Sequence, residues 1–195
     1  QGYTYVYRTK IYKDNTGHDE ENCKFIDRIA KTLLWVAGGY KLTVAGSPVV
    51  GEYVKNTFCH GGTRDFDARF MERVYENAFE VVKCDETTFP EEKKCSLSVG
   101  GHLDGCRIGF DAGGSDRKVS AVIDGEVVYS EEVVWFPKIT EDPNYHYNEI
   151  LTAMKTAASK MPRVDAIGVS SAGVYVNNKI MVASLFIKVN DDDFE

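Results

Sequence analysis

The stretch CRIGFDAGGSDRKVSAVIDGEVVYSEEVVWF, residues 106–136, decides the fold of the second half of the chain. It opens with an apolar run over residues 106–111, which is typical of a buried strand. The glycine pair Gly113-Gly114 follows at once, and Gly pairs are among the strongest local signals for a turn. The stretch therefore predicts a strand that ends in a tight, glycine-rich turn.

Downstream of this turn the pattern of strands continues. A second strand is predicted over Lys118 to Ile123, and a returning strand over Glu126 to Phe136. Asp124-Gly125 between them is the strongest hairpin signal in the chain, because these residue types accept the positive φ angles of a two-residue turn. A helix over Asn144 to Met161 and a buried strand over Val164 to Val169 follow. Because parallel strands need a crossover, the fourth strand is expected parallel to the first and the first three antiparallel.

Two more strands are predicted within residues 174–187, around a turn at Asn177-Asn178. For the lobe as a whole a mixed five-stranded sheet is expected. The first part of the chain is also α/β in character. Its expected elements are a strand over Tyr3 to Tyr12, a helix over Asp19 to Ala37, a strand over Lys41 to Ala45, a helix capped by Ser47-Pro48, a helix from about Asp67 and a strand over Phe79 to Lys83. Three regions result: an N-terminal α/β region (1–84), a linker or surface excursion (85–104) and the lobe at 105–195.

Composition narrows the function classes. The chain has 195 residues, is 43% hydrophobic and 27% charged, and carries a net charge of -7. This acidic balance argues against a nucleic-acid partner, which would favour a basic face. No run reaches the about 18 apolar residues of a membrane span, so no membrane partner is expected. The five cysteines are scattered without metal-ligand spacing, which favours reduced thiols and a cytoplasmic location.

The order strand, glycine turn, strand, hairpin, strand, helix, strand resembles the ribonuclease-H-like lobe shared by actin, Hsp70 and sugar kinases. Within that superfamily the residues IGFDAGGS at 108–115 resemble the first phosphate motif of the ROK family of repressors and sugar kinases, glucokinase among them. The family's motif is DxGGT followed by a hairpin. A second resemblance lies at 165–174, where the family carries a Gly-x-Gly-x-Pro-Gly segment. Together the two cover about residues 107–186.

This resemblance implies an ATP-dependent phosphotransferase that uses Mg²⁺ and phosphorylates a sugar hydroxyl. The ATP phosphates would be bound by the residues of the first motif, namely Asp111, Gly113, Gly114, Ser115 and Lys118. Glycines let backbone N–H groups approach a polyphosphate without a Cβ in the way. Asp111 would also orient Mg²⁺, commonly through water, because this ion keeps part of its hydration shell.

The second segment implies sugar-side contacts by Ser170, Ser171 and Gly173, although serine and alanine stand where the family has proline. The family's catalytic base is an Asp in an Asn-Asp pair. Asp191 forms such a pair but follows Gly173 too closely and is typical of a solvated acidic turn. The base is therefore expected beyond Glu195, and the chain alone is expected to lack kinase activity.

Two other functions stay open. The lobe could be a non-catalytic module that senses a sugar or nucleotide while residues 1–105 contact a protein partner. It could also belong to an activator-type ATPase, although those often carry cysteines for an iron–sulfur cluster and the isolated cysteines here do not favour one. The expected partners are ATP and a small sugar, and self-association into a homo-oligomer is left open.

Overall fold

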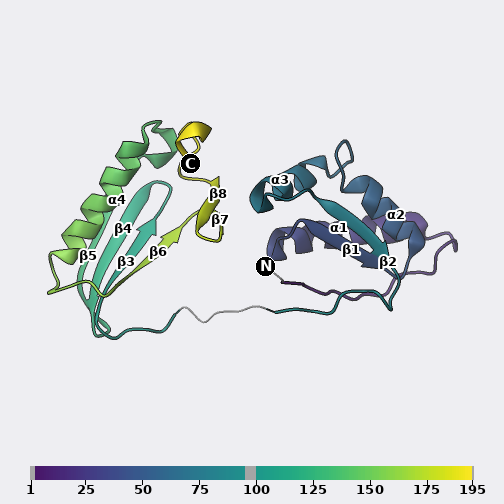
Figure 1. Ribbon diagram of the computed structural model, residues 1–195, viewed down its shortest axis with the longest axis horizontal. Helices are drawn as coiled ribbons and strands as arrows, with labels where there is room; N and C mark the ends of the chain where they lie inside the picture. The colour runs from purple at the N-terminus through teal and green to yellow at the C-terminus, as the bar shows by residue number, and fades with distance from the viewer. Residues whose placement is uncertain (1–2, 95–99, 195) are drawn as a thin grey trace. The chain divides into compact units, whose positions relative to one another are not determined.

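The computed structural model describes residues 3–94 and 100–194, and the chain divides into two compact units, Gln1–Ser98 and Val99–Glu195 (Figure 1). Each unit combines helices with strands. The first contains α1 (Asp19–Ala37), β1 (Lys41–Ala45), α2 (Pro48–Thr57), α3 (Asp65–Tyr75) and β2 (Glu80–Cys84). The second contains β3 (Cys106–Ala112), β4 (Asp116–Ile123), β5 (Glu126–Val134), η1 (Pro137–Ile139), α4 (Pro143–Ala158), β6 (Ala166–Ser171), β7 (Gly173–Val176), β8 (Lys179–Ala183) and η2 (Asp191–Phe194).

In the first unit, β1 and β2 form a parallel pair, and α2 and α3 lie between them in sequence. The predicted bounds of α1 and β1 are confirmed. Ser47 caps α2 by accepting a hydrogen bond from the amide of Val50 at 3.1 Å, with Pro48 in the first turn, as predicted. Among the described residues no helix is both long and apolar enough to span a bilayer.

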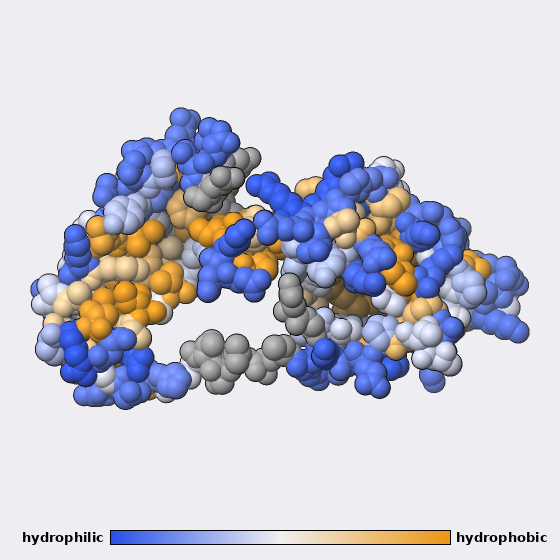
Figure 2. Space-filling view, in the orientation of Figure 1, coloured by the Kyte–Doolittle hydropathy of each residue, from blue (hydrophilic) through white to orange (hydrophobic). Residues whose placement is uncertain are grey.

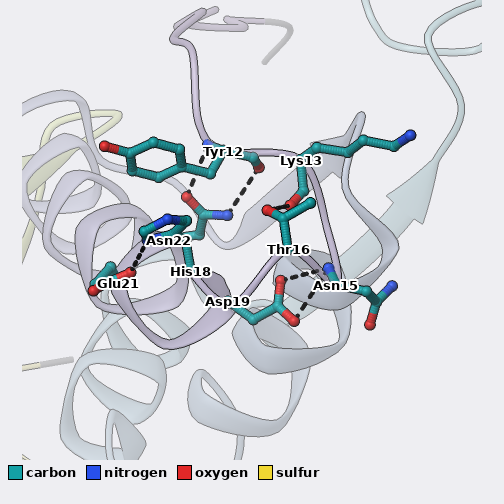
Figure 3. Close-up of polar contacts among 8 residues, drawn as sticks. All are labelled: Tyr12, Lys13, Asn15, Thr16, His18, Asp19, Glu21 and Asn22. Atoms are coloured by element: carbon teal, nitrogen blue, oxygen red, sulfur yellow. Dashed lines mark hydrogen bonds and ion pairs between the residues drawn. The ribbon is translucent and has the colours of Figure 1, made fainter.

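The strand predicted over Tyr3 to Tyr12 is wrong. Only Thr4 pairs with another chain segment, in an isolated antiparallel bridge to Lys93. At the end of the segment, the Tyr12 backbone is instead bound by the buried side chain of Asn22, which accepts from its amide at 3.0 Å and donates to its carbonyl at 2.9 Å (Figure 3). β-propensity alone cannot form a strand where no neighbouring ladder accepts the backbone.

The loop that leads into α1 is held by its own side chains (Figure 3). Asp19 accepts hydrogen bonds from the amide of Asn15 at 2.9 and 3.2 Å, and His18 packs on Tyr12 with ring centroids 4.1 Å apart. His18 is not itself a side-chain cap for the helix. Asn22 and Asp19 therefore fix the chain that enters the helix.

The second unit is built on a four-stranded sheet in the order β5-β4-β3-β6. β3 pairs antiparallel with β4, β4 antiparallel with β5, and β3 parallel with β6, with α4 as the crossover. This is the mixed topology that the sequence predicts. Asp124 and Gly125 have φ angles of 49° and 88°, so the β4–β5 hairpin has the expected turn.

One face of this sheet is covered by α4 (Figure 1). Ile108 and Phe110 of β3 and Ala121 of β4 are buried there against Ala153 and Ala157 of the helix. The small alanines on α4 let the helix approach the strands closely, as close packing of a core requires. Side chains at the alternate positions of the strands point to the other face.

In the described residues the main sheet has four strands and not the expected five, because neither of the two strands after β6 joins it. β7 and β8 pair with each other as a separate two-stranded sheet. Asn177 and Asn178 form their turn at φ angles of 51° and 66°, as predicted. The hairpin signal is thus correct, but the sheet to which the hairpin belongs is not the one expected.

Candidate functional site

The glycine turn connects the end of β3 to the start of β4 and is fixed by Trp135. The indole Nε1 of Trp135 donates to the carbonyl of Gly113 at 2.8 Å, and its backbone amide donates to the carbonyl of Ser115 at 3.1 Å. Trp135 is 1% exposed. A Cβ on Gly113 would lie 2.4 Å from the carbonyl oxygen of Asp116, so only glycine fits that position without a backbone shift. The turn is therefore rigid and specified by its sequence.

Asp116, at the start of β4, binds two of the predicted phosphate-site residues. The Ser115 hydroxyl donates to its carboxylate at 3.0 Å, and Lys118 pairs with the same carboxylate and, at 3.7 Å, with Glu132. The Lys118 hydrogen bond, followed by that of Ser115, lowers the pKa of Asp116, and Asp116 in turn raises the pKa of Lys118. Ser115 and Lys118 lie at the turn as expected, but each already has a protein partner.

The strand register brings the two sequence motifs together. Asp111 on β3 is the register partner of Lys118 on β4 and of Ser170 on β6. Glu132 on β5 is the next residue in this row, because it pairs with Lys118. Phe110 faces the α4 side, so the row lies on the opposite face of the sheet. The carboxylate predicted to orient Mg²⁺ and a predicted sugar-side hydroxyl are thus cross-strand neighbours.

The other two predicted sugar-side residues are placed differently. Ser171 pairs with Ala112, at the last register position of β3 and β6. Gly173 begins β7 with a φ of 144°, and a Cβ there would lie 2.4 Å from the carbonyl oxygen of Val182. That glycine is required by the β7–β8 hairpin itself. Its contact with a sugar stays a prediction.

Lys138 is a site residue that the sequence did not reveal. Its ammonium group lies over the glycine turn: a Cβ on Gly114 would be 2.5 Å from the Lys138 Nζ. Gly114, Ser115, Phe136 and Lys138 help to line a cavity of about 280 Å³ beside the turn. Among the residues that the structure describes, no carboxylate pairs with Lys138. The predicted phosphate motif therefore lies beside a cavity and beside Lys138, whose charge no carboxylate among the described residues neutralises.

The segment that carries Lys138 is anchored by a buried histidine. His146 of α4 is 2% exposed, and its Nε2 lies 2.9 Å from the carbonyl oxygen of Pro137. Its Nδ1 lies 3.2 Å from the carbonyl oxygen of Asp142. His146 is a buried structural histidine, and it positions η1 next to the turn.

The residues at the turn suit a magnesium ion only in part. Within the described ranges there is no group of three or more side chains that could enclose a metal. Asp111, half-buried, supplies a single carboxylate beside the Ser170 hydroxyl. Mg²⁺ is commonly bound by one or two carboxylates together with waters and substrate phosphates. The residues present therefore fit an ion that is shared with a phosphate ligand, and not a closed protein cage.

No catalytic base is identified at this site. The side chain of Asp191 lies outside the described residues, and only its backbone, at the start of η2, is placed. Four of the five cysteines, Cys23, Cys59, Cys84 and Cys106, are free thiols, and Cys95 lies outside the described residues.

Comparison with known proteins gives little beyond this geometry. No protein-family model and no curated protein sequence matches the chain, so the resemblance to the ROK family rests on the motifs alone. Among solved structures, the chain is similar to an exopolyphosphatase from Cytophaga hutchinsonii, at 12% identity and a TM-score of 0.27. The match covers 80% of this chain and 52% of that one, so the chain spans about half the length of the exopolyphosphatase.

Proposed function

We propose that the chain binds the phosphate groups of ATP, with Mg²⁺, at the glycine turn and the adjoining cavity, as part of a phosphotransferase that acts on a sugar hydroxyl. The observation that carries the proposal is Lys138. Its ammonium lies over Gly114, lacks a carboxylate partner among the described residues, and lines a cavity of about 280 Å³ beside the turn.

The chemistry of the turn suits a phosphate. Polyphosphates are bound by backbone N–H groups at close range together with a cationic side chain, and a lysine serves as a point charge for them. Gly114 has no side chain between its backbone and the Lys138 ammonium. A charge-assisted hydrogen bond contributes about 1.5–3 kcal/mol, so one lysine changes phosphate affinity by roughly tenfold to a hundredfold.

The remaining roles fall to the cross-strand row of Asp111, Lys118, Ser170 and Glu132, on the sheet face opposite α4. Asp111 would hold the waters of Mg²⁺, and the ion supplies neutralisation of charge on the transferred phosphoryl group. Ser170, its register neighbour, would donate to or accept from the acceptor sugar. Lys118 is held by Asp116 and Glu132, so it would balance the carboxylates of the row as well as contact phosphate.

Titration calorimetry with tripolyphosphate and with Mg·ATP tests the proposal. Lys138→Gln is expected to weaken binding at least about tenfold. Lys155→Gln removes the same charge from the last turn of α4 and is expected to leave the affinity unchanged. Asp111→Asn is expected to weaken Mg·ATP binding more than binding of tripolyphosphate without metal. Absence of binding at millimolar ligand, or equal affinities for Lys138→Gln and Lys155→Gln, would overturn the proposal.

A further inference from the structure

The cavity beside the glycine turn has an apolar part as well as a cationic one. Its apolar lining comes from the end of β5 and from the segment that follows, namely Val134, Trp135, Phe136 and Ile139. Trp135 is buried, but Val134, Phe136 and Ile139 are 68%, 58% and 73% exposed. Apolar surface gathers over the strands of the second unit (Figure 2), and these three residues share one cavity with Lys138. A ligand with a phosphate at Lys138 therefore meets apolar side chains next to it.

Phe136 is presented by a backbone that is held in place. Its amide donates a hydrogen bond to the Tyr145 hydroxyl at 2.9 Å, and its carbonyl accepts one from the Thr140 hydroxyl at 2.7 Å. The residues on either side of it, Trp135 and Pro137, are both buried. Ordering of side chains and loops is one of the costs of binding, and here the backbone is ordered beforehand. Phe136 therefore offers an exposed aromatic side chain on a preorganised support.

We propose that the base of a nucleotide stacks on Phe136, and that the site accepts nucleoside triphosphates without selecting among their bases. This inference rests on the proposed function, because the base would occupy the apolar part of the same cavity whose lysine binds phosphate. Purines and pyrimidines both have a π-face, so stacking on an aromatic side chain tolerates any base.

The size of the cavity fits this division of the ligand. Its volume of about 280 Å³ is close to the lower end of ligand pockets, which begin at roughly 300 Å³. The cavity is therefore suited to one end of a nucleotide and not to the whole molecule. The base would lie at Phe136 and the nearest phosphate at Lys138, and the remaining phosphates would extend along the glycine turn.

The hydrogen-bond donors around the apolar lining are already used within the protein. Trp135 donates its indole N–H and its amide to carbonyl groups of the glycine turn. The Phe136 amide donates to Tyr145, and the Ser115 hydroxyl donates to Asp116. Strong discrimination between similar ligands requires polar groups that would be left unpaired by the wrong one, whereas apolar contacts discriminate weakly. The affinities for ATP, GTP and CTP are therefore expected to agree within about tenfold.

Titration calorimetry with these three nucleotides and with tripolyphosphate, all with Mg²⁺, tests the inference. Phe136→Ser should weaken binding of each nucleotide by about fivefold to a hundredfold, because it removes the stacking platform. It should leave the affinity for tripolyphosphate unchanged, since that ligand has no base. Phe136→Tyr keeps an aromatic ring and should keep the nucleotide affinities. The matched control is Tyr147→Ser, which removes an aromatic residue of α4 that is 62% exposed and does not line the cavity, and it should change none of the affinities.

A fluorescent purine triphosphate whose emission is quenched by stacking gives a second readout. The wild type and Tyr147→Ser should quench it, and Phe136→Ser should not quench it even when saturated. The quenching and the comparison of bases are both made on the wild type, so they do not depend on any variant folding.

Failure of the stacking and failure of the phosphate site give different results. Unchanged nucleotide affinities in Phe136→Ser, together with weaker tripolyphosphate binding in Lys138→Gln, would overturn the stacking and leave the phosphate site standing. A preference of more than about tenfold for one base would overturn the absence of base selection. A wild type that binds no tripolyphosphate would overturn the proposed function and this inference with it.

Discussion

Alanine substitutions at the two adjacent glycines of the turn should differ in their effect on stability: Gly113→Ala should destabilise the protein, and Gly114→Ala should not. A Cβ on Gly113 would lie 2.4 Å from the backbone oxygen of Asp116, which cannot move without distorting β4. A Cβ on Gly114 would lie 2.5 Å from the Nζ and Cε of Lys138, the far end of a flexible side chain. Neither glycine has a positive φ, so the difference between them is steric and not conformational.

The expected changes in the free energy of unfolding depend on what each new Cβ would meet, the Asp116 backbone or the Lys138 side chain. A forced backbone shift in a packed region costs about 1–3 kcal/mol, while replacing a glycine in an allowed conformation gains about 0.4–1 kcal/mol through the unfolded state. Gly113→Ala is therefore expected to lose about 1–2 kcal/mol. Gly114→Ala should be neutral or stabilising by up to about 1 kcal/mol. For a unit of this size, the Gly113→Ala loss corresponds to a fall in melting temperature of roughly 5–15 °C.

Differential scanning calorimetry of the wild type and both variants measures the effect, and tripolyphosphate titration of the same samples adds the functional readout. Gly114→Ala should keep its melting temperature yet bind phosphate more weakly, because the methyl group displaces the Lys138 ammonium from the turn. Equal melting temperatures for the two variants would refute the steric reasoning. Unchanged phosphate affinity in Gly114→Ala would refute the role of the turn.

Two further predictions concern buried or bridging polar groups. Asn22→Asp keeps the acceptor for the Tyr12 amide but replaces the donor to the Tyr12 carbonyl by an oxygen, so it should lose about 1–3 kcal/mol, and an unchanged urea midpoint would contradict this. The hydrogen bond from Arg163, followed by that from the Cys106 amide, lowers the pKa of Asp165 below its ordinary value of 3.8. The stabilisation by the ionised Asp165 is therefore present above that pH and lost as the pH falls. Below about pH 5 the melting temperature of Asp165→Asn should consequently fall less steeply with pH than that of the wild type. Parallel curves of melting temperature against pH for the two proteins would show that Asp165 does not contribute.

Much of the candidate site could be anticipated because its signals are local. Asp111 and the glycine pair stand at the end of an apolar run, and this placement at a strand end is confirmed. The proximity of Asp111 and Ser170 also follows from sequence, once α4 is taken as the crossover that makes β3 and β6 parallel neighbours. The exact register between these residues was not predictable, since it depends on how the whole apolar face of each strand meets the helix.

The position of Lys138 at the glycine turn could not be predicted from local sequence patterns. Nothing near it in sequence resembles a phosphate motif, and it reaches Gly114 only because β5 returns alongside β4 and His146 anchors the segment at Pro137. The engagement of Ser115 and Lys118 by Asp116 is likewise a matter of side-chain positions around a folded turn. Such contacts depend on three-dimensional placement and leave no periodic signal.

The sequence by itself determined the elements whose cause is close by in the chain: the span of α1, the Ser47 cap, and the hairpin turns at Asp124-Gly125 and Asn177-Asn178. Helix periodicity, capping and turn geometry involve residues a few positions apart, so they can be read along the chain. Only the tertiary structure decided that residues 3–12 form no strand and that β7 and β8 stand apart from the main sheet. Strand pairing requires a partner from elsewhere in the chain, and whether that partner is present is a property of the folded molecule and not of the strand.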